Sequence, residues 1–279
     1  MLKLLLLCIV MCGYALPLPA QTDSVISAGQ KIIFSAPVSV YTGLAKQFAA
    51  DNLGNLYVLT DAGQLMKLNN RGDSLNVFNE VRRYGTVYAM DVTNPMKILL
   101  YYRNFSTIVM LDRYLNIVNT IDLRKHGIFQ ARAVGLAYDN NIWIFDEQSS
   151  KLKKIDENGK QITETVDLRQ VADFTLLPVK IIDRDGLVYL VDATNGLLVF
   201  DYYGTLKNTI ALTNLRDVQV ISETIAGRRK ENFVRYAPAT LDFREALLPA
   251  AIRAAKQIYI AQGGIYVLNN KGIELYPFQ

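Results

Sequence analysis

The sequence predicts an all-β fold, a six-bladed β-propeller whose blades have four strands each and whose last blade is closed by the N-terminal strand. Three observations support this prediction. Short runs rich in Val, Ile, Leu and Tyr alternate with turns of Gly, Asn and Asp along most of the 279 residues. The runs recur in groups of four at a period near 42 residues. No stretch shows a sustained helical period, except for a brief alanine-rich one at residues 250–255. Four strands at a regular period are typical of a propeller blade.

The first twenty residues are predicted to be a signal peptide. Lys3 supplies the positive charge, residues 4–10 form an apolar segment too short to span a bilayer, and Leu18-Pro19-Ala20 provides a cleavage site. Both cysteines of the chain lie in this segment. After cleavage near Ala20, residues 21–279 would form a single propeller domain without a thiol or a transmembrane segment, located in the periplasm or secreted.

The clearest blade begins at residue 47. A strand over 47–50 leads into the turn Asp51-Asn52-Leu53-Gly54-Asn55, and a second strand covers 56–59. Third and fourth strands are predicted over 63–68 and 74–78. Gly permits a positive φ in such a turn, while Asp and Asn cap it with side-chain hydrogen bonds.

Later segments repeat this order of strands. Second strands are predicted at 96–101, 141–145, 187–191 and 264–268; third strands at 107–111, 151–155, 197–200 and 272–276; fourth strands at 162–168 and 206–212. The centres of successive second strands are 42, 44 and 46 residues apart, and the next interval of 77 fits two shorter blades. The fifth blade therefore falls within 218–248, where 224–227 is a poor strand.

The sixth blade has three predicted strands before residue 279, so it requires one more. We expect residues 31–35 to supply the missing outer strand, which would pair the two chain ends and cover an exposed edge. The main alternatives are a ring of seven blades, each of about 37 residues, and a pair of β-sandwiches.

The repeat resembles a known propeller type. Residues 49–58, Ala-Ala-Asp-Asn-Leu-Gly-Asn-Leu-Tyr-Val, are similar to the A-V-D-x-x-G-N-I-Y-V pattern of NHL-type six-bladed propellers, and 136–144 and 182–190 match it in part. The resemblance covers nearly all of residues 30–279 and implies architecture, not a particular activity. Gln21, directly after the cleavage site, resembles the signal peptides of the Gram-negative phylum that uses type IX secretion, which implies a periplasmic protein of Gram-negative bacteria.

Six cations are candidate binding residues. Lys46, Arg132, Lys180 and Arg253 lie near the starts of predicted inner strands, where they would attract an anion or an acidic protein surface if they face one channel mouth. Solvated charges at strand ends are the alternative, and the register of each strand decides between them. Arg228 and Arg229 lie in the charged segment 225–232, which we interpret as an exposed hairpin, either a solvated loop or a docking loop.

Composition favours binding over catalysis. The net charge is +4 and the longest basic run has three residues, so a nucleic-acid partner is not expected. His126 is the single histidine, and no partner for a catalytic triad is visible. Acidic residues fall in turns, at Asp51, Asp139, Asp183 and Asp185, without the spacing of a calcium loop. We therefore expect no catalytic residue, metal or cofactor.

These features predict a non-catalytic periplasmic module that binds a protein partner in the cell envelope, within an outer-membrane or secretion assembly. Two alternatives stay open. The first is a metal-dependent, lactonase-like hydrolase or lyase. The second is a carbohydrate-binding propeller that uses exposed aromatics such as Tyr202 and Tyr203, because aromatic rings serve both protein interfaces and sugars. A small-molecule ligand is not identified by the sequence.

Overall fold

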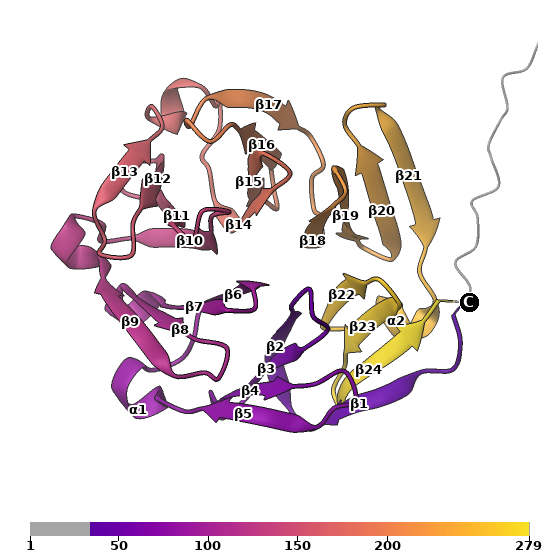
Figure 1. Cartoon of the computed structure of the whole chain (residues 1–279). Coiled ribbons are helices and arrows are strands. Elements are labelled where there is room, and N and C mark those ends of the chain that lie inside the picture. The colour runs from indigo at the N-terminus through magenta and orange to yellow at the C-terminus, as the bar shows by residue number, and fades with distance from the viewer. Residues whose placement is uncertain (1–33, 279) are drawn as a thin grey trace, which may run out of the picture. The chain divides into compact units, whose positions relative to one another are not determined.

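The computed structural model describes residues 34–278, which contain six antiparallel sheets of four strands each, arranged in a ring (Figure 1). The predicted six-bladed propeller is confirmed. The ring belongs to one unit, Lys31–Gln279. The predicted signal peptide and its cleavage site lie outside the described residues. Within residues 34–278, no helix has the length and apolar character needed to cross a membrane.

Each blade runs from an inner strand at the centre of the ring to an outer strand at its periphery (Figure 1). In blade order, inner strand first, the strands are β2 Ala45–Ala50, β3 Leu56–Thr60, β4 Leu65–Leu68 and β5 Ser74–Phe78; β6 Ala89–Asn94, β7 Lys97–Tyr102, β8 Thr107–Leu111 and β9 Ile117–Asp122; β10 Ala131–Leu136, β11 Ile142–Asp146, β12 Lys151–Ile155 and β13 Gln161–Glu164; β14 Pro178–Arg184, β15 Leu187–Asp192, β16 Gly196–Phe200 and β17 Leu206–Ile210; β18 Arg216–Ile221, β19 Thr224–Arg229, β20 Asn232–Ala237 and β21 Asp242–Leu247; β22 Gln257–Ala261, β23 Gly264–Leu268, β24 Gly272–Pro277 and β1 Val38–Thr42.

Short helices occupy some connections between these strands. They are α1 Val81–Tyr84, η1 Arg103–Phe105, η2 Leu123–His126, η3 Leu168–Gln170 and α2 Ala250–Arg253. The last of these confirms the helical stretch predicted around residues 250–255.

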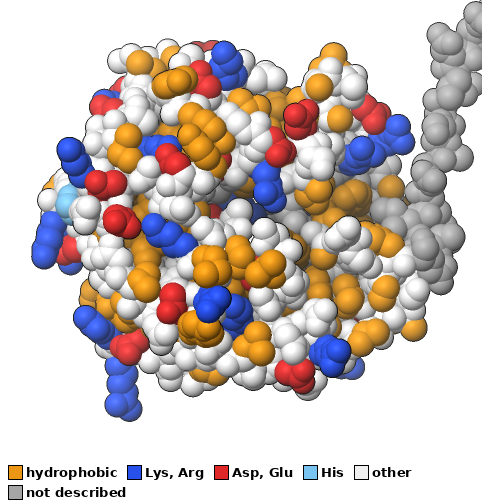
Figure 2. All heavy atoms as spheres, viewed as in Figure 1, with side chains coloured by type: hydrophobic (Ala, Val, Ile, Leu, Met, Phe, Trp, Pro, Cys, Tyr) orange, Lys and Arg blue, Asp and Glu red, His pale blue; other side chains and the backbone are white. Residues whose placement is uncertain are grey.

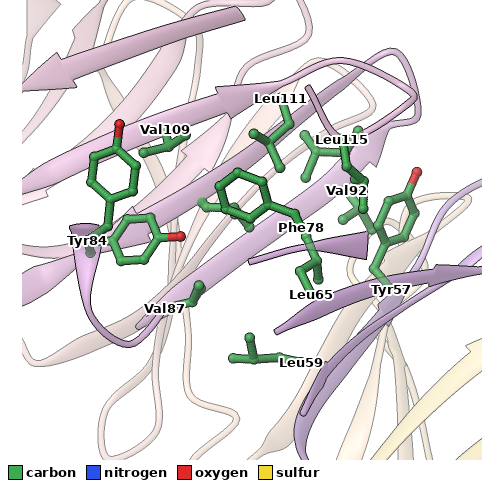
Figure 3. Close-up of a cluster of buried hydrophobic side chains, with 13 residues drawn as sticks. Tyr57, Leu59, Leu65, Phe78, Tyr84, Val87, Val92, Val109, Leu111 and Leu115 are labelled. Atoms are coloured by element: carbon green, nitrogen blue, oxygen red, sulfur yellow. The ribbon is translucent and has the colours of Figure 1, made fainter. Parts of the chain in front are cut away.

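The hydrophobic core lies between the blades rather than inside any one of them. Tyr57 and Leu59 of β3 pack against the second blade, as Figure 3 shows, whereas Leu56 and Val58 on the other face pack against the sixth. Because successive side chains of a strand point to opposite faces, a strand covered on both faces must be apolar throughout. This requirement produces the unbroken hydrophobic runs in the sequence.

The inner strands are joined by side chains that bond to the backbone of the next blade. The Gln257 amide of β22 pairs with both the N–H (2.9 Å) and the C=O (2.8 Å) of Phe48 in β2. Gln219 of β18 does the same at Ile260 of β22, at 2.7 and 3.0 Å. Between the second and third blades, a carboxylate oxygen of Asp91 accepts the N–H of Leu136 at 2.8 Å. These bonds satisfy backbone groups that no further strand covers.

The ring is closed where β1 pairs with β24, so the predicted role of the N-terminal strand is confirmed. The strand itself is shifted, because we predicted residues 31–35 and the structure uses Val38–Thr42. Phe34 makes only an isolated bridge, to Phe278, and residues 31–33 lie outside the described range. The packing of Tyr41 explains this position: its side chain packs against the core between the sixth and first blades, and the residue lies opposite Ile273 of β24.

The fifth blade differs most from its prediction. Residues 224–227, predicted as a poor strand, belong to β19, and Ile225–Gly227 are buried. The segment 225–232 is therefore not an exposed hairpin: β19 continues to Arg229, and the turn to β20 is confined to Lys230 and Glu231.

Candidate functional site

At the end of the ring at which the inner strands begin, every blade has at least one exposed side chain. We group one large side chain from each blade, leaving aside exposed neighbours such as Gln130 and Asn214. We call this set the strand-start rim. Its members lie within two residues of the first inner-strand residue and are, in blade order, Leu44, Tyr88, Phe129, Leu177, Arg216 and Lys256. All six inner strands surround the centre of the ring (Figure 1), so their first residues encircle one end of its axis.

Four consecutive blades contribute the apolar part of this rim. Leu44 is 58% exposed, Tyr88 43%, Phe129 55% and Leu177 40%. Scattered exposed apolar residues are ordinary, but a set at equivalent positions of adjacent blades indicates a contact surface.

Tyr88 shows that part of this surface is rigid. Its ring packs edge-on against Tyr101, and the guanidinium of Arg103 lies 5.0 Å from the ring centroid. Arg103 also donates to the Tyr88 hydroxyl at 3.3 Å. A ring held in this way loses little conformational entropy when a partner covers it.

The other two blades make the rim basic. Arg216 and Lys256 are exposed, and Lys46 lies nearby on the inner strand of the first blade. Among residues 34–278, none of these three cations forms an ion pair. Figure 2 shows one face of the molecule, hollowed near its centre, and does not label these three residues.

Of the cations predicted from the sequence, Lys46 and Arg132 occupy equivalent places. Each is the extra residue at a register shift between the inner strand and its neighbour, in the first and third blades respectively. Arg132 is paired, since its guanidinium donates to Glu147 at 2.9 Å, and the same carboxylate lies 3.4 Å from Arg103. Its charge is therefore largely compensated.

Lys180 is a solvent-accessible lysine on the inner strand of the fourth blade, and its ammonium donates to the carbonyl oxygen of Val218 at 2.9 Å. Although the side chain as a whole is exposed, the surrounding inner strands partly desolvate the ammonium and lower the pKa of Lys180, and the carboxylates of Asp91 and Asp217 oppose that shift. Because Asp91, Val218 and Lys180 belong to three different blades, the ammonium faces the centre of the ring.

Arg228 corrects the prediction of an exposed docking loop. Its side chain is fully buried, and the guanidinium lies 2.8 Å from Asp217. It also donates to the carbonyl oxygens of Ile252 at 3.2 Å and Ala255 at 2.9 Å. Arg228 therefore joins the fifth blade to the connection that leads into the sixth, and it is not available to a partner.

Arg229 and Arg253 are each paired with a carboxylate. Arg229 lies 2.7 Å from Glu245 on the outer strand of its own blade. Arg253 ends α2 rather than starting an inner strand, and it lies 2.8 Å from Glu231. The six predicted cations are thus not gathered at one mouth of the ring. The rim residues Arg216 and Lys256 were not predicted, because the sequence around a single charged residue does not show how far along a strand it lies.

The opposite end of the inner strands holds a cleft of about 370 Å³, which we call the turn cleft. Turns of four blades line it, with residues Asn52, Thr93, Asn94, Pro95, Leu136, Ala137, Tyr138, Asn140, Asp183, Arg184, Asp185 and Tyr202. The structure therefore brings Tyr202, a candidate for aromatic contacts, together with the two turn aspartates Asp183 and Asp185. Small-molecule sites have typical volumes of roughly 300–1,000 Å³.

Asp183 lies at the wall of this cleft between two aromatic donors. One carboxylate oxygen accepts Trp143 Nε1–H at 3.0 Å, and the other accepts the Tyr202 hydroxyl at 3.1 Å. Burial raises the pKa of Asp183 above its ordinary value, although both hydrogen bonds favour the ionised form.

The other two turn carboxylates have structural partners. Asp51 accepts the backbone N–H groups of Leu53 and Asn55 at 2.9 and 2.8 Å, and also the Tyr57 hydroxyl at 3.2 Å. Asp139 lies 2.6 Å from the ammonium of Lys154. Across residues 34–278 there is no group of three His, Cys, Asp or Glu side chains placed to hold a metal ion.

The sequence matches no protein-family model and no curated protein. Among solved structures, the chain is similar to a streptogramin B lyase, with 18% identity, 83% of this chain and 78% of that one covered, and a TM-score of 0.59. Virginiamycin B lyase from Staphylococcus aureus has 13% identity, 88% and 89% coverage, and a TM-score of 0.60. BamB from Moraxella catarrhalis has 13% identity, 88% and 94% coverage, and a TM-score of 0.53. At identities of 13% and 18% this likeness concerns the fold, and it agrees with the architecture above: the chain is a six-bladed β-propeller.

Proposed function

We propose that the chain is a non-catalytic module of the bacterial cell envelope that binds a protein partner through the strand-start rim. The observation that carries this proposal is the run of four exposed apolar side chains on consecutive blades, from Leu44 to Leu177, at one end of the ring. Aromatic and aliphatic side chains in a rigid setting are the usual anchors of protein interfaces.

The charge of the rim specifies the partner further. Arg216 and Lys256 complete the circle with two exposed cations, and Lys46 adds a third. We infer that the partner presents an apolar segment flanked by Asp or Glu side chains, because buried apolar area supplies affinity while opposite charge speeds association and fixes orientation.

The envelope location rests on the predicted signal peptide, and an outer-membrane or secretion assembly is the setting we propose. The structural likeness to BamB from Moraxella catarrhalis is compatible with a propeller in such a role. The absence of cysteine from residues 21–279 suits an oxidising compartment.

Site-directed photocrosslinking in the native envelope tests this proposal. A photoreactive phenylalanine analogue replaces Phe129 on the rim or, as a control, Phe243, which is 45% exposed on an outer strand. We expect the analogue at position 129 to capture a discrete envelope protein that the analogue at position 243 does not. Equal capture from both positions, or none from position 129, would count against the rim as a docking surface.

The likeness to two lyases favours one competing function, an enzyme of the metal-dependent hydrolase or lyase type. Calcium or magnesium titration monitored by thermal unfolding distinguishes it, since a specific metal raises the melting temperature by mass action. We expect no shift at millimolar metal, and a saturable rise together with turnover of a lactone or ester would replace our proposal.

A further inference from the structure

The turn cleft contains an exposed aromatic platform. Tyr138, in the turn between β10 and β11, is 65% exposed. Its ring is stacked on that of Tyr202 from the neighbouring blade, with centroids 4.3 Å apart and planes 18° from parallel. One face of Tyr138 is thus covered by protein, and its large exposed fraction leaves the other face open to a ligand.

A buried cation, Lys154, lies beside both stacked rings of this platform. The Lys154 ammonium lies 5.3 Å from the centroid of Tyr138, 5.8 Å from that of Tyr202 and 5.2 Å from that of Trp143. Asp139 neutralises it at 2.6 Å. Tyr202 is further held by its hydrogen bond to Asp183 at 3.1 Å. Cation–π contacts and the hydrogen bond pre-organise the platform, which reduces the entropic cost of binding.

Polar groups line the cleft around the platform, and they include both donors and acceptors. Asn94 and Asn140 bond to each other at 2.7 Å, and each amide retains further hydrogen-bonding capacity. Asn52, Arg184 and Asp185 are exposed at the cleft from two other blades. The charged side chains that line the cleft are Asp183, Arg184 and Asp185, and both oxygens of Asp183 are already hydrogen-bonded to Trp143 and Tyr202. The exposed charges are therefore one of each sign, which leaves no strong excess for an ion to bind.

A neutral saccharide fits this combination of groups. The C–H face of a pyranose ring packs on an aromatic ring, while its hydroxyl groups both donate and accept hydrogen bonds, as amide, carboxylate and guanidinium groups require. We propose that the turn cleft binds a neutral saccharide, with one pyranose ring on the open face of Tyr138 and its hydroxyls bonded by Asn52, Arg184 and Asp185. This site lies at the opposite end of the inner strands from the strand-start rim and does not depend on the proposed protein docking.

Two adjacent tyrosines provide a matched test. Tyr203 is 86% exposed and follows Tyr202 directly, but it does not line the cleft. The full propeller is applied to an array of neutral and acidic oligosaccharides, and the affinity of the best neutral ligand is then measured by calorimetry for wild type, Tyr138→Ala and Tyr203→Ala. Both side chains are exposed, so both variants should fold, and their melting temperatures check this.

We expect a neutral oligosaccharide to bind, Tyr138→Ala to weaken it ~10-fold or more, and Tyr203→Ala to change it less than about 2-fold. The intrinsic fluorescence gives a second readout, because Trp143 is the only tryptophan and bonds to Asp183 at the cleft. The saccharide should therefore shift the emission of the wild-type protein. No binding of any neutral oligosaccharide at millimolar concentration, preference for acidic ones, or equal loss in both variants would overturn the proposal.

Discussion

Arg228 and Asp217 form an ion pair of 2.8 Å inside the fifth blade, with the arginine side chain fully buried. A buried pair is costly to break because the remaining charge has no solvent to compensate it. The pair also holds the carbonyl groups of residues 252 and 255 through the guanidinium. It is therefore a structural contact between the fifth blade and the chain that leads to the sixth.

Replacing Arg228 should destabilise the fold far more than replacing its neighbour. We expect Arg228→Met to lower the free energy of unfolding by about 3–5 kcal/mol, because Asp217 would be left buried without its partner. Arg229→Met removes a partly exposed pair with Glu245, and the expected loss is below about 1 kcal/mol. Urea unfolding of the two variants measures the difference, and similar losses would contradict the structural role of Arg228.

Ring closure should be sensitive to one glycine. A Cβ on Gly272 would clash with the carbonyl oxygen of Tyr41, and the φ of +147° at this position disfavours residues other than glycine. We expect Gly272→Ala to separate β1 from β24 and to lower stability by about 1–3 kcal/mol. Gly263 in the same blade has open space around its Cβ position, so Gly263→Ala should stay within about 0.5 kcal/mol of wild type. Thermal unfolding of the two variants measures these changes. If Gly272→Ala were as stable as wild type, close contact between β1 and β24 at this position would not be needed for ring closure.

Asp183 should titrate above the ordinary value of 3.8, because burial raises its pKa. Trp143 donates to this carboxylate, so its fluorescence should change with a midpoint above 3.8 in wild type and show no such transition in Asp183→Asn. The native state binds this proton more tightly than the unfolded chain does, so the contribution of Asp183 to stability falls as pH rises from 3.8 through the raised pKa. The stability of Asp183→Asn relative to wild type should therefore increase over that window. A midpoint at or below 3.8 would contradict the buried setting of the carboxylate.

Much of the fold follows from local pattern. Strands such as β8, β16 and β23 are buried on both faces, so their sequences are largely apolar and easily recognised; 107–111 and 264–268 were predicted to the residue. The prediction for 151–155 was equally accurate although this strand contains three lysines, because its place in the repeat was regular. The position of the closing strand was less accurate, because pairing with β24 is long-range and depends on Gly272 and Tyr41. The local composition of residues 31–42 does not predict that long-range contact.

The candidate sites were harder to predict for a different reason. Arg228 looked exposed because three cations in a row usually are, and only the tertiary position of Asp217 shows that one of them is buried. The stacked rings of Tyr138 and Tyr202 belong to two different blades, and a contact between residues so far apart in sequence leaves no local pattern that could predict it. Equivalent positions at the starts of the inner strands could have been compared across repeats, and that comparison would have found Leu44 and Tyr88.

The basic part of the strand-start rim should control the rate of partner binding. Reversing the charge in Arg216→Glu/Lys256→Glu removes attraction toward an acidic partner, so association should slow at low ionic strength and approach the wild-type rate at high salt. Lys160→Glu alters a lysine in an outer turn, distant in sequence from every inner strand, and should have a smaller effect. Surface plasmon resonance with the crosslinked partner measures these rates, and salt-independent rates in all proteins would argue against an acidic partner.

The central claim is that the apolar part of the strand-start rim holds an envelope protein, and quantitative co-purification from the native envelope tests it most directly. The rim variant is Leu44→Asp/Phe129→Asp, and the control is Leu53→Asp/Phe243→Asp, whose side chains are 69% and 45% exposed away from the rim. We predict that the protein captured at position 129 co-purifies with wild type and with the control. With the rim variant, the amount of co-purified partner should fall ~10-fold or more, while the melting temperature of the variant stays at the wild-type value. Equal recovery with the rim variant and the control would contradict the claim.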